Sequence, residues 1–500
     1  MYIGLDIGTS GTKAELIDGE GKVIDAHQIS YSFCNTENGY RELDATAVWN
    51  AVLTCLMKAG QKRPVKTITV SALGEAIVLI DQNGLPMAPS ITGTDARGAD
   101  ELKEMIQILG EEALMDITGL NLSTIYSVNK ILWLKKHNRR LYEGAWKIVT
   151  FQDYIIFRLT GTAAIDYSMA SRTMMFDISK NDWSEEILQK AGIDRTKLSR
   201  PCRAGTVVGT AAPSIAREMG LGPNIRIVAG THDHICNAIG AGAADYGECV
   251  NTVGTTEGLT ALIKRPQLYT DGIKAFQISC EPFVRPDMFN TVAWNHTSGV
   301  LLKWFAREFA ENKYGNTDLM EIYCRLNGEM KPLPTDLLVL PHFSGAATPH
   351  MDENAKGVIL GLTLNTHSSD IYKALMEGAN YELALILDCL KQSGLEPKKL
   401  IAAGGALSDK LLQIKADILG CEIYTTGSRQ TGTLGGAILG AVASNDFTDI
   451  SEAVHKMVKK ADVYEPDSVN HRRYKERFMI YRDLYERTRP ICHRLSKVKE

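Results

Sequence analysis

The same order of strand, glycine turn and strand occurs twice in this chain, once at its start and once near its middle. Over residues 3–8, apolar residues alternate with small or polar ones, which predicts a strand with one buried face. A Gly-Thr-Ser-Gly turn at 8–11 leads into a second strand at 13–17. Residues 249–262 repeat this order around a Gly-Thr-Thr turn. The repeat predicts an internal duplication, and therefore two units of related fold.

The rest of the chain alternates strand-like and helix-like runs, which is typical of an α/β fold. The strand-like runs are 67–70, 76–80, 147–150, 225–229, 337–340, 400–402 and 422–425. The helix-like runs are 45–59, 128–137, 235–241, 371–390 and 430–445. Small residues at 240–247 predict a flexible connection. For 500 residues we expect two α/β domains, residues 1–245 and 246–500, with a cleft between them.

Charge and composition exclude several classes of function. The net charge of −4, from 55 Lys and Arg against 59 Asp and Glu, gives no field strong enough to hold a nucleic acid. No basic and apolar leader opens the chain, and the charge-free stretch at 430–445 is shorter than the ~20 residues that span a bilayer. The 10 cysteines form no CxxC pair, so neither a disulfide framework nor a zinc site is indicated. We expect a cytoplasmic protein with reduced thiols and no membrane contact.

The two glycine turns are candidate phosphate sites. Turns of Gly, Thr and Ser expose backbone N–H groups and hydroxyls, which bind phosphate oxygens. The candidates are Thr9 and Ser10 in the first turn and Thr255 and Thr256 in the second. Neither turn is a Walker A loop or a GxGxxG motif. One such turn is more often a plain hairpin, but a pair, one in each domain, predicts a grip on one polyphosphate.

Two charged residues flank the first turn. Asp6 precedes it, where a carboxylate would hold Mg²⁺, through water, against phosphate oxygens. Lys13 follows it as a point charge for the same oxygens. These two residue types beside a glycine turn predict a site for a metal-bound polyphosphate.

Asp233 is the candidate general base. It lies in the sequence Gly-Thr-His-Asp-His at 230–234, between a strand and a helix. A carboxylate at the carboxyl end of a strand, facing a cleft, accepts the proton of a hydroxyl that attacks a γ-phosphorus. The alternative is that Asp233 caps the helix. His232 and His234 are candidates for hydrogen bonds to substrate hydroxyls or for packing, and a metal site with Asp233 would need further ligands.

A Gly-Gly turn at 404–405 follows the strand-like run 400–402 and precedes a helix. Glycines let the backbone lie close to a flat or phosphorylated ligand. Alone, this turn is equally a plain connection between a strand and a helix.

Together these motifs resemble the FGGY family of carbohydrate kinases, in the actin-like ATPase superfamily, over nearly the whole chain. Residues 6–10 and 251–256 resemble its phosphate motifs, and Asp233 falls where the family keeps its catalytic base. The other resembling segments are 160–161, 166–171, 341–350, 357–363, 377–378 and 403–417.

The resemblance implies two actin-like, ribonuclease H-like domains around a central cleft for ATP, Mg²⁺ and a sugar. It implies transfer of the γ-phosphate of ATP to a hydroxyl of a sugar, ketose or polyol, as in xylulokinases, gluconokinases and glycerol kinases. The residues it implies for the nucleotide are Thr255, Gly299, Lys303, Gly404, Gly405 and Asp409. The residues expected on the sugar side are Glu75, Asp95, Arg97 and His234.

This chain departs from the family pattern on the sugar side. Residues 73–75 are Leu-Gly-Glu where many members have Gln-Met-His or Gln-Arg-Glu. Gly93 stands where a Trp is common, and 346–347 are Ala-Ala where Glu-Arg is frequent. The xylulose, glycerol and gluconate groups are therefore all imperfect matches. The two glycines, Gly74 and Gly93, predict a pocket open to a bulkier or differently oriented polyol.

Two other classes of function remain open at this point. An actin-like or chaperone-type ATPase would use the same fold, but it has no need of Asp233 or of the sugar-side residues. A sugar-sensing repressor would need a DNA-binding module, for which neither a basic patch nor room before the first hairpin is evident. The sequence does not indicate which sugar reacts or which of its hydroxyls is phosphorylated. It also does not fix the oligomeric state, for which we consider a homodimer.

Overall fold

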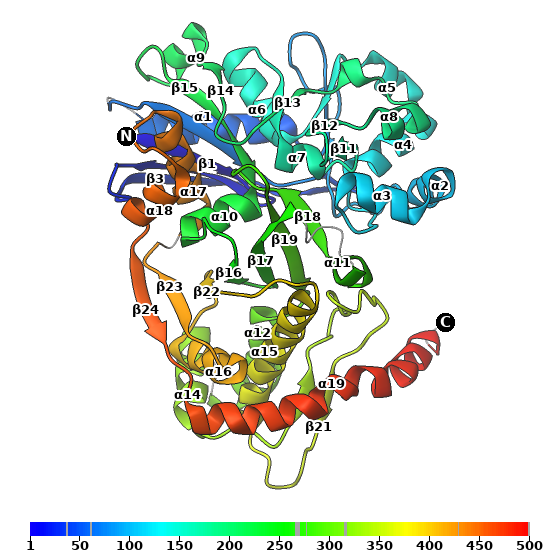
Figure 1. Ribbon diagram of the computed structural model, residues 1–500, viewed down its shortest axis with the longest axis vertical. Helices are drawn as coiled ribbons and strands as arrows, with labels where there is room; N and C mark the ends of the chain where they lie inside the picture. The colour runs from blue at the N-terminus through cyan, green and yellow to red at the C-terminus, as the bar shows by residue number, and fades with distance from the viewer. Residues whose placement is uncertain are drawn as a thin grey trace.

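Two mixed β-sheets organise the chain (Figure 1). The computed structural model describes residues 1–36, 39–60, 63–265, 271–276, 278–314, 318–428 and 430–498. The first sheet has the order β14 (Val207–Thr210), β15 (Arg226–His232), β6 (Thr67–Ala72), β1 (Tyr2–Ile7), β2 (Gly11–Ile17) and β3 (Val23–Ser30). The second has the order β18 (Ser279–Pro282), β19 (Met288–Asn295), β17 (Glu257–Lys264), β16 (Glu248–Val253), β22 (Lys399–Ala403), β23 (Ile423–Thr426) and β24 (Lys460–Tyr464).

The two sheets share one pairing scheme. Strand β1 pairs antiparallel with β2 and parallel with β6, and β16 pairs antiparallel with β17 and parallel with β22. On one side a further antiparallel strand follows, β3 in the first sheet and β19 in the second. On the other side a parallel strand and then an antiparallel one follow, β15 and β14 in the first sheet and β23 and β24 in the second. This agreement supports the internal duplication predicted from the two glycine turns.

Helices cover both sheets. Those of the first half are α1 (Ala45–Gly60), α2 (Ala99–Leu109), α3 (Glu111–Thr118), α4 (Ser127–His137), α5 (Arg139–Gly144), α6 (Phe151–Thr160), α7 (Tyr167–Ser171), α8 (Glu185–Ala191), α9 (Pro213–Glu218) and α10 (Asp233–Ala241). Those of the second half are α11 (Asp271–Ala275), α12 (Gly299–Phe305), the π-helical turn η3 (Ala306–Ala310), α13 (Glu311–Tyr314), α14 (Leu319–Glu329), α15 (Ser368–Gln392), α16 (Asp409–Leu419), α17 (Thr431–Ala443), α18 (Ile450–Met457) and α19 (Ser468–Lys497).

Short strands complete the fold away from the two main sheets. Strands β4 (Cys34–Asn35), β5 (Arg41–Leu43) and β8 (Ser90–Ile91) form one small sheet. The remaining pairs are β7 (Val78–Ile80) with β9 (Lys147–Val149), β10 (Ala164–Asp166) with β13 (Arg200–Cys202), β11 (Phe176–Asp177) with β12 (Asp182–Trp183), and β20 (Leu338–Leu340) with β21 (Val358–Leu360). A 3-10 turn, η1 (Arg195–Lys197), lies before β13.

The glycine-rich helix α17 belongs to the second half of the chain but packs on the first sheet and on α10 (Figure 1). Backbone meets backbone there, since a Cβ on Gly4 of β1 would lie 1.8 Å from the carbonyl oxygen of Thr433. A Cβ on Gly435 would lie 2.0 Å from the carbonyl oxygen of Cys236. Only residues without a side chain allow so close an approach. The buried helix predicted at 430–445 is confirmed, and the domain boundary near residue 245 remains a prediction.

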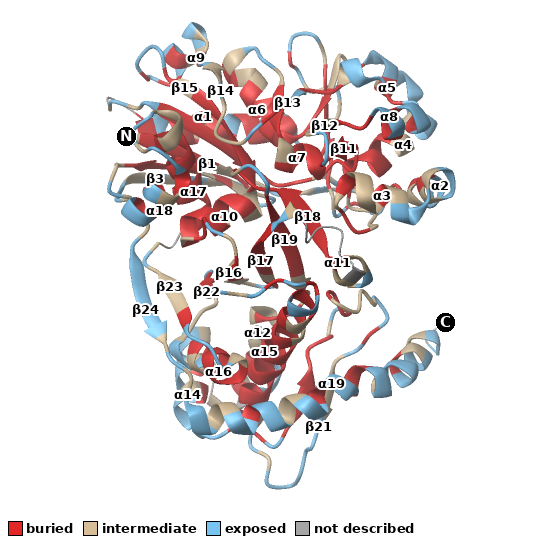
Figure 2. Ribbon diagram, in the orientation of Figure 1, coloured by how far each residue is buried: buried red, intermediate tan, exposed pale blue. Residues whose placement is uncertain are grey.

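The α/β fold, with its alternation of strands and helices, is confirmed. Buried residues gather on the two sheets and on α15 and α17 (Figure 2). The helices expected at 45–59, 128–137 and 371–390 appear as α1, α4 and α15, while α10 starts two residues earlier than predicted, at Asp233. All ten cysteines are free. In the part of the chain that the structure describes, no helix is both long enough and apolar enough to cross a membrane.

Candidate active site

The first glycine turn closes the hairpin of β1 and β2 and leaves its tip free. The N–H of Gly8 donates to the carbonyl oxygen of Gly11 over 3.0 Å, and the Tyr31 hydroxyl donates to the carbonyl oxygen of Gly8 over 2.7 Å. Thr9 and Ser10 are exposed at the tip. These contacts fix the turn from behind, so its hydroxyls remain available to a ligand.

Asp6 lies on β1 beside open space. It faces Lys13 across the hairpin, and the Lys13 Nζ donates to Gln430 Oε1 over 2.9 Å. Burial, and then the nearby carboxylate of Asp233, raise the pKa of Asp6 to about 7, although Lys13 opposes them. A Cβ on Gly432 would lie 3.1 Å from Asp6 Oδ2, so the glycine keeps the space in front of this oxygen open. An acidic group of this kind, with no hydrogen bond from the described residues, fits a hydrated cation.

The second glycine turn joins β16 to β17 and rests on the start of α12. The N–H of Gly254 donates to the carbonyl oxygen of Thr256 over 2.9 Å, and the N–H of Gly299 donates to that of Gly254 over 3.0 Å. A Cβ on Gly299 would lie 2.5 Å from this Gly254 oxygen, so the contact requires a glycine. Thr255 and Thr256 are exposed at the tip, as their counterparts in the first turn are.

The turn after β22 lies against the second glycine turn. Gly404 has a φ of +114°, and its Cβ would lie 2.2 Å from the carbonyl oxygen of Val253. The N–H of Ala406 donates to the same oxygen over 3.2 Å, and the Ala406 side chain would lie 3.1 Å from a Cβ on Gly299. Nothing lies within 4 Å of a Cβ on Gly405. Three segments of the second half therefore meet through backbone atoms and leave Gly405 facing open space.

The two charged residues predicted for the nucleotide lie at the rim of this region. Lys303 is exposed on α12. Asp409 is exposed at the start of α16, where its Oδ1 accepts a hydrogen bond of 2.7 Å from the Tyr464 hydroxyl. Their roles toward a nucleotide remain predictions.

Asp233 is the first residue of α10, directly after β15. The N-cap of α10 is His232, so Asp233 does not occupy the capping position that was its alternative role. Its Oδ1 is buried and accepts no hydrogen bond from the described residues. His232 Nε2 lies 3.3 Å from this oxygen, and His234 Nε2 lies 3.9 Å from it. A buried carboxylate oxygen without a donor is free to accept a proton or a hydrogen bond from a ligand.

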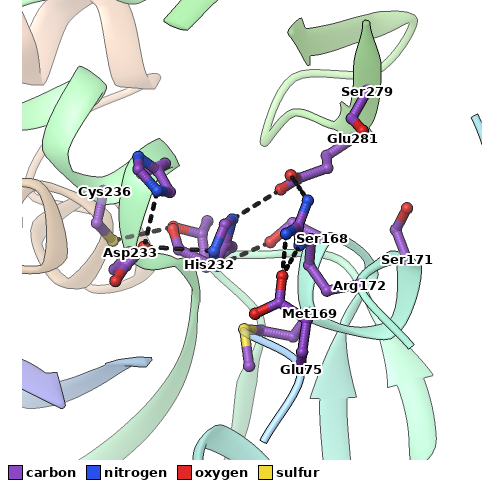
Figure 3. A network of polar contacts seen from close by, with 12 residues as sticks. Glu75, Ser168, Met169, Ser171, Arg172, His232, Asp233, Cys236, Ser279 and Glu281 are labelled. Carbon is purple, nitrogen blue, oxygen red and sulfur yellow. Dashed lines mark hydrogen bonds and ion pairs between the residues drawn. The ribbon is translucent and has the colours of Figure 1, made fainter. Parts of the chain in front are cut away.

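Behind Asp233, charged side chains form a continuous network (Figure 3). His232 Nδ1 lies 3.0 Å from Glu281 Oε2, and Arg172 Nη1 donates to Glu281 Oε1 over 3.2 Å. Arg172 also forms a close ion pair with Glu75. Glu281 comes from β18 of the second sheet, whereas the other members belong to the first half of the chain. The network therefore joins the two halves directly behind the candidate base.

Strand β18 is fastened to the first half by its backbone and by a serine. The N–H of Cys280 donates to the carbonyl oxygen of Gly119 over 2.7 Å, and the Ser279 hydroxyl donates to Asn121 Oδ1 over 2.6 Å. Ser279 Oγ also lies 3.0 Å from the Tyr126 hydroxyl. These contacts hold Glu281 at a fixed place against the first half.

The expectation of a pocket opened by two glycines is wrong. A Cβ on Gly74 would lie 3.0 Å from His232 Nε2 and 3.4 Å from Arg172 Cγ. A Cβ on Gly93 would lie 3.2 Å from both Cβ and Oε2 of Glu75. The room that these glycines leave is therefore filled by side chains of this chain, and it holds the ion network rather than a larger ligand.

His232, Asp233 and His234 are close enough to be considered as metal ligands, with one ligand atom of each within 4.8 Å of the others. Both ring nitrogens of His232 already face carboxylates, Glu281 on one side and Asp233 on the other. A metal ion needs the lone pair of a neutral imidazole nitrogen. The surroundings of His232 favour the protonated ring instead, in agreement with the sequence, which gave no third ligand cluster.

Asp95 and Arg97 lie together but are engaged with each other. Asp95 Oδ1 accepts hydrogen bonds from Arg97 N and Nε, at 2.9 and 2.7 Å. Asp95 Oδ2 accepts from the N–H of Arg41 and from Arg97 Nη2, at 2.7 and 2.8 Å. Among the described residues no hydrogen bond or ion pair joins either one to Glu75. Contact of Asp95 and Arg97 with a sugar stays a prediction.

Comparison with known proteins decides the family. The family model described as "FGGY family of carbohydrate kinases, N-terminal domain" matches residues 1–240. The model of the C-terminal domain of the same family matches residues 249–444. The chain belongs to the FGGY family of carbohydrate kinases. It is 26% identical to a xylulose kinase of Staphylococcus xylosus, over 97% of this chain and 99% of that one. It is also 26% identical to a gluconokinase of Bacillus subtilis, over 96% and 95% of the two chains.

Solved structures of FGGY kinases share this fold. A ligand-bound xylulose kinase from Lactobacillus acidophilus superimposes with a TM-score of 0.89 at 24% identity, over 97% of this chain and 98% of that chain. A Plasmodium falciparum glycerol kinase with ADP superimposes with a TM-score of 0.87 at 21% identity, over the same shares. Family membership confirms the prediction of a carbohydrate kinase, a phosphotransferase with an alcohol group as acceptor.

Sequence reasoning missed Arg172 and Glu281, and it treated His232 only as one of two neighbouring histidines. Arg172 follows the family-like segment 166–171, and Glu281 lies in a strand without any motif. One signal was available in the sequence. Gly74 and Gly93 both lie against the network, because a Cβ on either would meet His232, Arg172 or Glu75.

Proposed function

We propose that this protein transfers the γ-phosphate of Mg·ATP to a hydroxyl group of an uncharged sugar or polyol, with Asp233 as the general base. The observation that carries the proposal is the buried Oδ1 of Asp233, which lacks a hydrogen bond from the described residues at the start of α10. A substrate hydroxyl donating to this oxygen would give up its proton as it attacks the γ-phosphorus.

The nucleotide is proposed to lie between the two glycine turns. Thr9 and Ser10 on one side, and Thr255 and Thr256 on the other, offer exposed hydroxyls at turns whose backbone is held from behind. Gly405 offers open backbone beside the second turn. Asp6 is the residue proposed to hold Mg²⁺ through water, and a bound Mg²⁺ would neutralise charge on the phosphate oxygens.

The charges around Asp233 favour an uncharged substrate. Arg172 is the guanidinium nearest to the base in the network, and Glu75 and Glu281 both pair with it. A substrate carboxylate would therefore have to displace one of these buried acids to reach Arg172, which is costly. Glu75 Oε2 accepts no hydrogen bond from the described residues, so it is available to a substrate hydroxyl.

Replacement of the base tests the mechanism. We expect Asp233→Asn to lower sugar-dependent ADP release by ~10²–10⁴-fold, because a positioned general base contributes about that much. The thermal unfolding midpoint should stay close to that of the wild type, since the amide keeps the shape of the carboxylate. Asp483→Asn, on the exposed face of α19, is the matched control and should keep full activity. Turnover of Asp233→Asn within about tenfold of the wild type would remove Asp233 from the mechanism.

A substrate screen tests the chemical class. Coupled ADP release should be measured with ketopentoses, ketohexoses, tetritols, inositols, glycerol and aldonates, with and without Mg²⁺. We expect at least one uncharged compound to be phosphorylated and the aldonates to be poor substrates. An aldonate as the preferred substrate would contradict the assignment of an uncharged substrate without affecting the role of Asp233.

A further inference from the structure

Glu281 is the acid that the second sheet contributes to the network behind Asp233. It is fully buried, and both of its carboxylate oxygens are engaged, one by His232 and one by Arg172 (Figure 3). Among the described residues, none of its hydrogen bonds or ion pairs reaches a glycine turn, and the proposed reaction gives it no task. A carboxylate taken wholly out of water costs free energy unless it is paired, so its presence at this place calls for a reason.

His232 stands between two acids. Its Nδ1 faces Glu281 and its Nε2 faces Asp233, at 3.0 and 3.3 Å. A neutral imidazole has one N–H and one lone pair, so only the imidazolium turns an N–H toward each carboxylate. Toward Asp233 Oδ1 the contact is an ion pair without a hydrogen bond, so this oxygen can still accept one from a ligand. Burial alone would lower the pKa of His232, but Glu281 and then Asp233 outweigh burial and raise this pKa to about 9.

The other charged groups around His232 must be counted as well. They are Arg172 directly after α7, which pairs with Glu75, His234 on α10, and Asp6 on β1, whose carboxylate is near enough to that of Asp233 for the two charges to repel each other. The acids are thus Asp6, Glu75, Asp233 and Glu281, against the cations Arg172 and His232. With a neutral His232, the 3.3 Å contact at Asp233 Oδ1 would no longer be an ion pair, and this carboxylate would lose the charge that orients it.

We propose that Glu281 is a positioning residue for the phosphoryl transfer: it holds the His232 imidazolium against Asp233, and the imidazolium keeps that carboxylate oriented. The proposal rests on the proposed function of Asp233 as the base. Glu281 acts through His232 and does not touch the substrate. Since Glu281 belongs to β18, the second half of the chain completes the base of the first half, and the site is assembled only when β18 is docked.

The decisive experiment compares pH profiles of variants in the full-length protein. We expect Glu281→Gln to lower kcat by about 10-fold or more near pH 7, the effect of losing one buried charge-assisted hydrogen bond. Without Glu281, His232 loses its proton at lower pH, so the imidazolium that orients Asp233 is lost sooner as the pH rises. The basic limb of kcat/KM should therefore move to lower pH by about one unit. The KM for Mg·ATP should change less than threefold.

A matched control separates positioning from stability. Glu377 on α15 is equally buried, in the core of the second half, and it accepts hydrogen bonds from Thr335 and Tyr474. We expect Glu377→Gln to lower the thermal midpoint and to leave the basic limb in place. A basic limb in Glu281→Gln that coincides with that of Glu377→Gln would overturn the proposal.

A double-mutant cycle shows whether Glu281 acts through His232. If it does, Glu281→Gln should change kcat less than twofold in a His232→Gln background, because the link is already cut. If the two substitutions instead lower kcat by factors that multiply in the double variant, the residues act independently and the proposal is overturned. If Glu281→Gln does not fold, His232→Gln alone should still abolish the basic limb, and an unchanged limb would count against the proposal. Failure of the base assignment would be seen separately, because Asp233→Asn would then keep full activity whatever the Glu281 and His232 variants do.

Discussion

The two sides of the candidate active site are built in opposite ways. Around Asp233, the charged side chains of Glu75, Arg172, His232 and Glu281 come from separate segments and pair with one another (Figure 3). All of them except Glu75, which is partly buried, are buried. Around the second glycine turn, the contacts are between backbone atoms, and positions 254, 299 and 404 are all glycine. Under the proposed function, the first construction would recognise a ligand by charge and hydrogen bonds at fixed places. The second would recognise it by letting the backbone come close.

The largest expected effect comes from removing the cation of the charged side. Arg172→Met leaves Glu75 without its cation and Glu281 with His232 alone, and an uncompensated buried charge costs about 3–5 kcal/mol. We expect a clear fall of the urea midpoint and loss of sugar phosphorylation. The affinity of the refolded variant for ADP should stay within threefold, if the two sides are independent.

Arg487→Met is the control for that variant, because Arg487 pairs with Asp483 on the exposed face of α19. An exposed pair contributes ~0–1 kcal/mol, so its midpoint should hardly move. Equal losses of sugar turnover and of ADP affinity in Arg172→Met would contradict the division into two independent sides.

A smaller effect is expected from filling the glycine side. Gly404→Ala places a Cβ against the carbonyl oxygen of Val253 at a positive φ, and we expect it to cost ~2–4 kcal/mol through overpacking and backbone strain. Gly405→Ala is the paired variant, since nothing lies within 4 Å of its Cβ. Gly405→Ala should keep the thermal midpoint and raise the KM for ATP about threefold or more.

A further control is Gly328→Ala on α14, where the Cβ also meets open space. It should neither lower the thermal midpoint nor raise the KM for ATP. Both glycine variants should leave the basic limb of kcat/KM where it is. A shifted basic limb in Gly405→Ala would show that the backbone side and the charged side are coupled.

The contrast also explains what the sequence could and could not predict. The glycine side can be predicted because each of its parts is local in the sequence. A turn such as 254–256 is recognised from a few consecutive residues, and the threonines that supply its hydroxyls are among them. Asp6 and Asp233 were found in the same way, from their place beside a turn or at the end of a strand. The α/β order and the helices followed from periodicity for the same reason.

The charged side was hidden because it is not local. Glu75, Arg172, His232 and Glu281 come from segments separated by about fifty residues or more, and no spacing rule links them. Glu281 reaches His232 because β18 contacts the first half, where the Cys280 N–H donates to the carbonyl oxygen of Gly119. The same gap in information led to the wrong expectation at Gly74 and Gly93, because a glycine shows that a side chain is missing but not which neighbour takes its room.

Asp6 belongs to both constructions, and its pH dependence gives the smallest expected effect. It lies beside the glycine at 432 and beside the carboxylate of Asp233, and burial together with that carboxylate raises its pKa to about 7 from 3.8. Between these two pH values the folded chain binds more protons at Asp6 than the unfolded chain does. Stability from this group is therefore full below about pH 4 and is lost as the pH rises through 7.

The comparison of wild type with Asp6→Asn isolates this contribution, because other raised acids such as Asp153 and Asp166 titrate in both proteins. Without Mg²⁺ or nucleotide, the stability of Asp6→Asn relative to the wild type should rise by ~1–2 kcal/mol from pH 4.5 to pH 7.5, after allowance for partial solvation. Thermal midpoints measured across that range provide the check. A difference between the two proteins that does not vary with pH would mean that Asp6 is as well solvated as an ordinary surface acid. The charged side would then end at Asp233 and would not extend to the phosphate hairpin.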